Sequence, residues 1–255
     1  MAWDGESAQR LLNGTSGMFN SRLYSDLEVL CKDGATYYVH KYIVCPQSDF
    51  FRNACNPDHG FKEAQENVID LSNDDPALVK AVLRFFYYHD YEPTTNTEPM
   101  LLFHTKMYVM GAYYFIPGLK EHAKKKFRSL ILDGSWETKE FPDAIAEIYD
   151  WTVESDKGLR DVVVRATTDN FDTLKTDQHF LDVAWSIPEF SVEVMTHTLS
   201  PPGAPSPPKT YKCGKCLKAV DLCLPRNAPY RQFYFCTKCG FGFLTREWKQ
   251  MEVVG

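Results

Sequence analysis

Four cysteines near the C-terminus constrain the fold of this chain more than any other feature. They form two Cys-x-x-Cys pairs, Cys213 with Cys216 and Cys236 with Cys239, and residues 217–235 lie between the pairs. Two such pairs supply the four thiolates of the tetrahedral shell that Zn²⁺ takes in closed structural sites. The spacing therefore predicts one structural Zn²⁺ ion bound by these four residues. Four thiolates leave no open position for water or substrate, so the pattern does not indicate catalysis by the ion.

The segment that carries these cysteines, residues 210–255, is too short to bury a large apolar core, and domains of this size usually need a metal or disulfides. Aromatic and other β-forming residues flank the second cysteine pair, which predicts a hairpin around it. The segment resembles a zinc ribbon. Gly240 follows the last cysteine, where such turns often need a positive φ, whereas Gly214 lies inside the first pair. Cys223, between the pairs, is expected to be a small core residue.

The composition of the 255-residue chain is that of a globular protein with a real core, because 44% of the residues are hydrophobic and 24% are charged. The N-terminus has no basic stretch that leads into an apolar run, and no segment approaches the roughly 18 uninterrupted apolar residues of a membrane span. Free thiolates suit a reducing compartment. We therefore expect an intracellular protein with no membrane segment, and the sequence leaves both nucleus and cytoplasm open.

Charge is distributed unevenly along the chain. Residues 201–255 contain nine Lys or Arg and three Asp or Glu, whereas the net charge of the whole chain is -6. Two interpretations remain open. The basic segment contacts nucleic acid or an acidic protein face, or its lysines offset the negative charge of a four-thiolate zinc centre.

A proline-rich segment, residues 200–209, separates the cysteine module from the rest of the chain. Five of the fifteen prolines of the chain fall within residues 201–208, and no bulky apolar residue accompanies them. Such a composition favours an extended polyproline conformation without a packed core. We expect this segment to be a semi-rigid linker.

The part of the chain before the linker alternates between two periodicities. Residues 25–40 predict a β-hairpin with a Lys-Asp-Gly turn, and residues 67–71 predict another short strand. Helical periodicity follows in several places, most clearly after Asp75, which supplies an N-cap ahead of a proline at the first helical position. Two more helices are predicted between residues 100 and 132, with a corner at Ile116-Pro117-Gly118. The body is therefore predicted to be mostly helical around one small sheet.

Several short segments of residues 20–132 follow one another in a characteristic order. They are Tyr24-Ser25-Asp26-Leu27, Tyr38-Val39-His40-Lys41, Ser48 with Phe50-Phe51, Phe61-Lys62-Glu63, Val68-Ile69-Asp70-Leu71, Asp74-Asp75-Pro76 and Phe85-Phe86-Tyr87-Tyr88 with Tyr91. With these segments, residues 20–132 resemble the BTB/POZ domain, a protein-interaction module in which a helical cluster is flanked by a short sheet. The compact N-terminus and the His-Asp-Tyr corner at residues 89–91 are similar to the BTB proteins of filamentous fungi.

The resemblance implies two contact sites. In BTB adaptors of cullin-RING ubiquitin ligases, a hydrophobic residue and a glutamate at the positions of Phe61 and Glu63 contact the cullin; the alternative is an ordinary loop in which Phe61 packs on its own domain. In dimeric BTB families, residues at the positions of Asp26 and Lys41 line a charged pocket near the dimer seam. A purely structural role is the alternative for Asp26 and for His40, namely strand-end hydrogen bonding and helix capping.

Residues 133–199 continue the helical pattern and are similar to the helical extension that follows many BTB domains. Three tryptophans of this region, Trp136, Trp151 and Trp185, are expected to lie in the core. The predicted organisation is an N-terminal segment at 1–19, the BTB/POZ-like domain at 20–132, the extension at 133–199, the linker at 200–209 and the zinc module at 210–255. The fold class is α+β, with a small β zinc ribbon at the end.

No phosphate-binding loop, nucleophile elbow, dinucleotide fingerprint or zinc-protease pattern occurs in the sequence, so we expect a protein that is not an enzyme. Two functions remain open. The first is an interaction protein that pairs with itself or with another BTB-containing protein, and that serves as a substrate adaptor of a cullin-RING ubiquitin ligase. The second is a nuclear regulator of transcription or chromatin whose basic zinc ribbon contacts nucleic acid.

Overall fold

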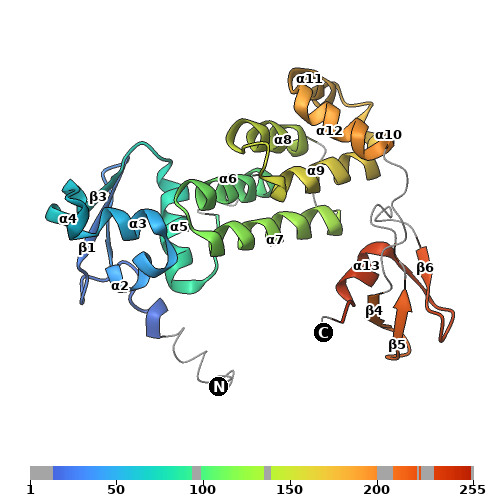
Figure 1. The fold of residues 1–255 in the computed structure, drawn as a ribbon, viewed down its shortest axis with the longest axis horizontal. Coiled ribbons are helices and arrows are strands. Elements are labelled where there is room, and N and C mark those ends of the chain that lie inside the picture. The colour runs from blue at the N-terminus through green and yellow to red at the C-terminus, as the bar shows by residue number, and fades with distance from the viewer. Residues whose placement is uncertain are drawn as a thin grey trace. The chain divides into compact units, whose positions relative to one another are not determined.

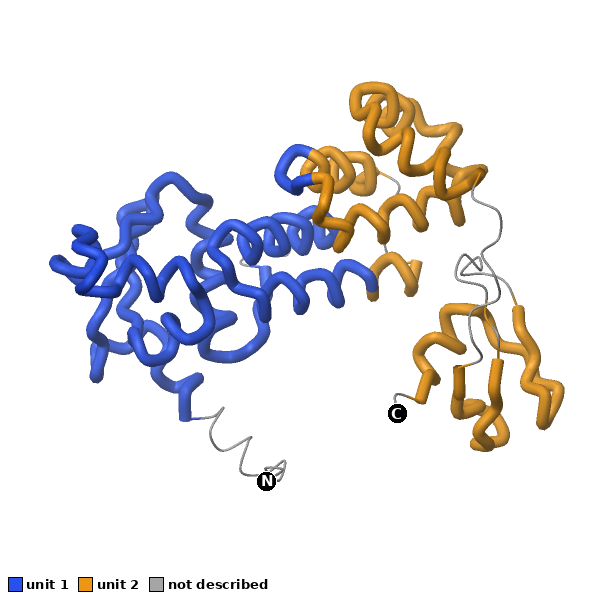
Figure 2. Tube along the Cα trace, in the orientation of Figure 1, with its two compact units in different colours: residues 1–128, 150–153 blue, residues 129–149, 154–255 orange. Residues whose placement is uncertain are grey.

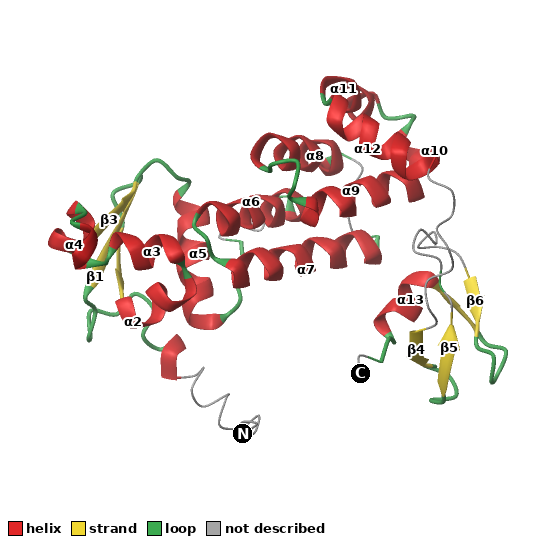
Figure 3. Ribbon diagram, in the orientation of Figure 1, coloured by secondary structure: helices red, strands yellow, loops and turns green. Residues whose placement is uncertain are grey.

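The protein was analysed as a computed structural model that describes residues 14–93, 99–134, 139–199, 209–222, 224 and 233–253. It consists of helices with three small sheets (Figures 1 and 3). The chain divides into two compact units, residues 1–128 with 150–153 and residues 129–149 with 154–255 (Figure 2). Trp136, Cys223, most of the predicted N-terminal segment and nearly all of the predicted linker lie outside the described residues.

The sheet of the first unit has the strand order β2-β1-β3. Strands β1 (Leu27–Cys31) and β2 (Thr36–Val39) pair antiparallel, with Leu27 opposite Val39, which confirms the predicted hairpin. Strand β3 (Val68–Leu71) pairs with β1 in parallel. Alternate residues of β1 are buried while Glu28 is exposed, so one face of the sheet packs on the domain core and the other meets solvent.

The helices of the first unit begin where the sequence offers a cap. Ser48 accepts a hydrogen bond from the N–H of Phe51, and Asp75 accepts one from Ala77 ahead of Pro76. The core is made by the buried aromatic and aliphatic side chains of these helices. The helical elements are α2 (Lys41–Val44), η1 (Cys45–Gln47), α3 (Asp49–Ala54), η2 (Pro57–His59), α4 (Lys62–Glu66), α5 (Pro76–Tyr88), α6 (Met100–Tyr113) and α7 (Pro117–Asp133), and the boundary between the units falls within α7.

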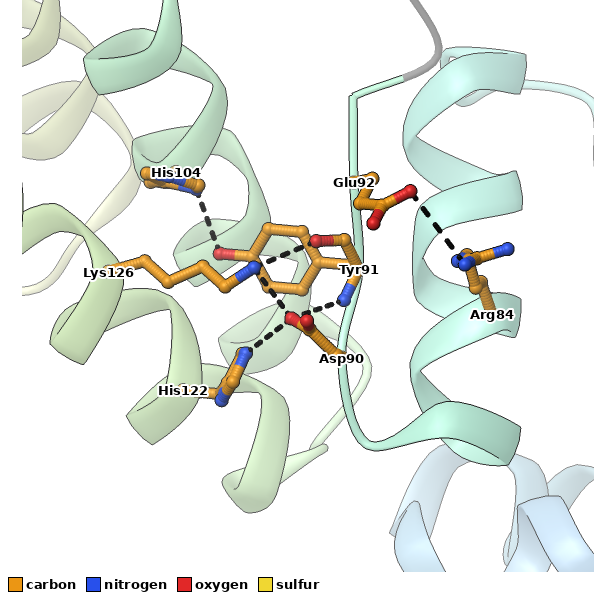
Figure 4. Close-up of polar contacts among 7 residues, drawn as sticks. All are labelled: Arg84, Asp90, Tyr91, Glu92, His104, His122 and Lys126. Carbon is orange, nitrogen blue, oxygen red and sulfur yellow. Dashed lines mark hydrogen bonds and ion pairs between the residues drawn. The ribbon is translucent and has the colours of Figure 1, made fainter. Parts of the chain in front are cut away.

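A polar cluster anchors the His-Asp-Tyr corner after α5 (Figure 4). The Asp90 carboxylate contacts Lys126 Nζ at 2.6 Å and His122 Nε2 at 2.8 Å, and Lys126 also donates to the Tyr91 carbonyl at 2.9 Å. Despite the opposing effect of partial burial, these hydrogen bonds lower the pKa of Asp90 to about 2. Tyr91 is fully buried, and its hydroxyl lies 3.1 Å from His104 Nδ1.

The helical part of the second unit begins in α7 and ends at Leu199. Its inward side is built from buried apolar side chains such as Phe141, Ile145, Val163 and Phe190. The elements are α8 (Glu140–Trp151), of which the last two residues belong to the first unit, α9 (Lys157–Asp169), α10 (Phe171–Leu174), α11 (Gln178–Ser186) and α12 (Pro188–Leu199).

The prediction that Trp151 and Trp185 lie in the core is wrong, because their exposed fractions are 63% and 74%. Trp151 is the last residue of α8, and the buried stripe of that helix continues at Thr152 instead. In α11, Phe180 is buried, and Trp185 lies five residues on, about 140° around the helix from it. The helical period itself therefore places Trp185 away from the core.

The C-terminal module contains two antiparallel hairpins and a short helix. The first hairpin pairs β4 (Lys209–Lys212) with β5 (Ala219–Leu222), and the second pairs β6 (Phe233–Phe235) with β7 (Gly242–Leu244). Helix α13 (Thr245–Gln250) follows β7 directly. The predicted hairpin around the second cysteine pair is confirmed. Across the part of the chain that the structure describes, no helix combines the length and apolar character that crossing a membrane requires.

Candidate functional site

The two hairpins of the C-terminal module bring the four predicted cysteines together. Their Sγ atoms all lie within 4.8 Å of one another, and among the described residues this is the one convergent group of three or more potential His, Cys, Asp or Glu ligands. Cys213 Sγ is 3.8 Å from Cys239 Sγ, and Cys216 Sγ is 3.8 Å from Cys236 Sγ. Four sulfurs placed about 2.3 Å from a central Zn²⁺ in a tetrahedron lie about 3.8 Å apart. The donor set and its spacing therefore fit a four-thiolate zinc site.

Both cysteine pairs have the same backbone turn. The N–H of Leu217 donates to the Cys213 carbonyl at 2.8 Å, and the N–H of Gly240 donates to the Cys236 carbonyl at 2.8 Å. Leu217 and Gly240 have φ values of 57° and 70°. The first turn therefore also has a left-handed residue at the position that Gly240 occupies in the second turn. This residue is Leu217, although leucine adopts the left-handed conformation less readily than glycine.

Gly214 serves a different purpose in the first turn, which is close packing. A Cβ atom at this position would lie 3.1 Å from Met251 Sδ and 3.5 Å from the Phe243 ring. The absence of a side chain thus lets the turn approach the core of the module.

Backbone N–H groups around Cys213 and Cys236 favour negative charge on these sulfurs. Cys213 and Cys236 are buried, and the N–H of Lys238 lies 3.4 Å from Cys236 Sγ. Burial alone raises the pKa of Cys213, but hydrogen bonds from the N–H groups of Cys216 and Lys215 outweigh it and lower this pKa below its usual value. Backbone donors around the sulfurs are the usual second layer of a thiolate metal site.

Trp248 forms the centre of the small core beside the cysteines, and sequence reasoning missed it. Its side chain is fully buried, its Nε1 donates to the Tyr234 carbonyl at 2.9 Å, and its ring contacts those of Tyr211 and Phe243. The sequence could have indicated its burial, because Trp248 lies in an amphipathic stretch directly after the second hairpin. Trp248 connects the two hairpins through the core to which Cys213 and Cys236 also belong.

A second candidate site surrounds Phe61, which precedes α4. Its side chain is 50% exposed and its ring meets that of His59 edge to face, with centroids 5.9 Å apart. Phe61 and Glu63 line a groove of about 410 Å³ together with residues of α3 and the corner after α6. The ring is therefore partly packed on its own domain and partly open, and a cullin contact at Phe61 stays a prediction. The groove is lined by Asp49, Phe50, Asn53, Ala54, Phe61, Glu63 and Phe115.

Phe115 is the groove residue that the sequence did not single out. It is 62% exposed and has a φ of 49°, and its carbonyl accepts a hydrogen bond from the N–H of Asp49. This bond ties the corner after α6 to the start of α3. Its signal in the sequence was an aromatic residue immediately before the Ile-Pro-Gly corner.

A third candidate surface contains Asp26 and Lys41. The Asp26 carboxylate accepts a hydrogen bond from the N–H of Lys41 at 2.7 Å, so it caps α2 as the structural alternative predicted. His40 also has the structural role of the alternative, because it occupies the N-cap position of α2 and its buried ring bonds to the Tyr87 hydroxyl and the Leu23 carbonyl, although its side chain does not cap the helix.

Large apolar side chains surround this capped strand end. Leu23, Tyr24 and Tyr42 are exposed by 64%, 79% and 90%. They lie within three residues of Asp26 or Lys41 in the sequence. The charged pair is therefore bordered by apolar surface that the domain itself does not cover.

Comparison with known proteins bears on the first unit only. No protein with a curated description matches the chain. The BTB (Tramtrack and Bric a brac) domain of human gigaxonin is similar in structure, with 17% sequence identity and a TM-score of 0.36, over 48% of this chain and 92% of that domain. The family model described as BTB/POZ domain matches residues 16–128. These residues, with their β2-β1-β3 sheet and helical cluster, are a BTB/POZ domain.

Proposed function

We propose that the protein is a non-enzymatic adaptor, in which the BTB/POZ domain binds a cullin scaffold and another part of the chain selects the client. A BTB/POZ domain implies protein–protein interaction, and the groove around Phe61 supports the more specific role. The half-exposed ring of Phe61 provides apolar area that a partner can bury, and Glu63 provides a charge that orients the contact. This groove is the observation that carries the proposal.

The test is co-elution of the full chain with the N-terminal region of a cullin on a sizing column, followed by titration calorimetry. Phe61→Ala is expected to raise the Kd about 30-fold or more, since a central aromatic anchor typically contributes 2 kcal/mol or more. Glu63→Ala should weaken binding less. Two matched controls, Phe171→Ala on α10 and Glu66→Ala on α4, should leave the Kd unchanged. Absence of any complex with the unaltered chain would refute the cullin proposal.

We also propose that the surface around Asp26 and Lys41 pairs with a second copy of the chain or with another BTB-containing protein. The exposed Leu23, Tyr24 and Tyr42 support this, because an apolar surface beside a charged pair has the character of an interface. Light scattering on the full chain should give a dimer mass that Tyr42→Asp reduces to that of a monomer. A monomer at all concentrations of the unaltered chain would exclude self-association.

A second function, contact between the C-terminal module and nucleic acid in a nuclear regulator, is favoured by the exposed lysines of this module. Lys212, Lys215, Lys218 and Lys238 are all exposed. A zinc ion held by the four cysteines would fold the module on which these lysines are displayed. Binding of a DNA duplex to the full chain, weakening steeply with salt, is the expected result.

A further inference from the structure

The outer face of the β6–β7 hairpin carries two exposed aromatic rings. Phe233 and Phe235 are separated by one residue, so their side chains lie on the same face of the strand, and they are 59% and 64% exposed. Tyr234 points to the opposite face, where it packs against the core around Trp248. The two phenylalanines are therefore not part of the core of the module.

The rings lie over the neighbouring strand in a defined arrangement. Phe235 is directly opposite Gly242 in the register of the hairpin. A Cβ atom at Gly242 would lie 2.8 Å from Phe235 Cε1 and 3.4 Å from Phe233 Cδ1. Both rings therefore rest against the backbone at Gly242, and a Cβ atom there would require the Phe235 ring to shift. Aromatic rings held in place on a strand lose little further conformational freedom when a ligand stacks on them.

Basic side chains lie at the cysteine end of this hairpin. Phe235 immediately precedes Cys236, whose Sγ is 3.8 Å from that of Cys216, so both cysteine turns are at this end. Lys238 and Lys215, one in each turn, are exposed, and Lys215 Nζ lies 5.6 Å from the centre of the Phe241 ring.

The acidic residues of the described module do not cancel this charge. The described part of the module contains seven Lys or Arg and three Asp or Glu, and Glu252 pairs with Lys209 at 2.6 Å, so an excess of positive side chains remains. Exposed rings and exposed lysines therefore occur close together at the cysteine end of the module.

We propose that this face, defined by Phe233 and Phe235 with the lysines of the two cysteine turns, binds single-stranded nucleic acid by stacking bases on the rings. Only unpaired bases offer an accessible π-face together with regularly spaced phosphates, whereas the base faces of a duplex are covered by their neighbours. The inference rests on the proposed contact between the C-terminal module and nucleic acid, and it assigns the strandedness of the ligand and the residues that bind it.

The test measures fluorescence anisotropy of a labelled oligothymidylate of about 20 nucleotides, long enough for one such site, against the zinc-loaded full chain. Phe233→Ala and Phe235→Ala are each expected to raise the Kd about 5- to 100-fold, the usual effect of losing one base–aromatic stack. Phe235→Trp should retain the affinity, whereas Phe235→Leu should raise the Kd about as much as Phe235→Ala, because leucine has no π-face. Gly242→Ala should weaken binding without removing a ring, because its Cβ displaces Phe235. Phe171→Ala, which removes a phenylalanine that is 49% exposed from α10, is the matched control.

Zinc content and tryptophan fluorescence of each variant verify that the module is folded. A log–log salt dependence with a slope near -2 is expected if about three phosphates are contacted. Three results would overturn the inference. Binding of a DNA duplex in preference to the single strand would refute it while leaving the proposed nucleic-acid contact intact, and absence of binding to either would refute both. Unchanged affinity of Phe235→Leu would show that the face makes an apolar rather than a stacking contact.

Discussion

Acidification should destabilise the BTB/POZ domain through His104, which α6 places in the core. His104 is 4% exposed, and its ring contacts those of Phe103 and Tyr91, with Nδ1 3.1 Å from the Tyr91 hydroxyl. Burial, followed by the positive charges of Lys126 and His122, lowers the pKa of His104 from 6.5 to about 4. Asp90 is the nearby group that opposes this shift. The neutral imidazole is therefore the form that the fold accepts.

The direction of the pH effect follows from proton binding. Below pH 6.5 this histidine is protonated in the unfolded chain but not in the folded chain. The free energy of unfolding therefore decreases as the pH is lowered to about 4, where the folded form also takes up the proton. With these two pKa values, the free energy of unfolding should fall by about 2 kcal/mol between pH 7.5 and pH 5, and by about 3 kcal/mol in all.

Urea unfolding of the full chain, followed by far-ultraviolet circular dichroism across this pH range, measures the effect. The His104→Asn variant should be less stable at neutral pH but should lose about 2 kcal/mol less on acidification than the unaltered chain. His59→Asn, which changes an exposed histidine, should leave the pH dependence unaltered. If the curves of the unaltered chain and His104→Asn run parallel, the assignment to His104 is refuted.

Four further outcomes are expected. Metal analysis should find one zinc per chain, and chelation should make residues 210–255 sensitive to protease, because metal binding contributes on the order of 10 kcal/mol to the folding of such modules. Leu217→Gly should stabilise the zinc-loaded module by about 1 kcal/mol in thermal unfolding, since it relieves a left-handed leucine. Asp90→Asn should destabilise the first unit by about 1 kcal/mol at neutral pH, a value already reduced because solvent screens the half-exposed carboxylate. The difference in unfolding free energy between this variant and the unaltered chain should vanish as the pH falls from 3.8 toward 2, because Asp90 is then protonated in both the unfolded and the folded chain. Trp185→Ala should change the unfolding free energy by less than about 0.5 kcal/mol, because the side chain is exposed.

Features of the fold that depend on neighbouring residues could be predicted from the sequence. The Asp75-Pro76 start of α5 and the corner at Ile116-Pro117-Gly118 are local, because capping and the restrictions of proline act within one helical turn. The four cysteines were also predictable, since a fixed spacing of thiols has few other uses in a chain of this kind.

Features that depend on distant residues could not be predicted. The parallel pairing of β3 with β1 joins segments about forty residues apart, and nothing in either strand specifies the partner. The same holds for Phe115, which reaches the groove around Phe61 only because the corner after α6 bonds to the start of α3. The left-handed conformation of Leu217 could not be predicted either, because leucine has no preference for a positive φ.

The C-terminal module consists of two separate hairpins, and this division determines the order in which the module can fold. Each hairpin pairs residues that are close in the chain, so each can form within microseconds, but an isolated two-stranded hairpin is marginally stable in water. The sulfur contacts of 3.8 Å each join one hairpin to the other. A metal ion held by the four cysteines would therefore add a second connection to the one that Trp248 makes between the hairpins, and the rate of its capture should rise in proportion to free zinc. The concentration of zinc in the cell would then set how soon a newly made chain acquires a working C-terminus.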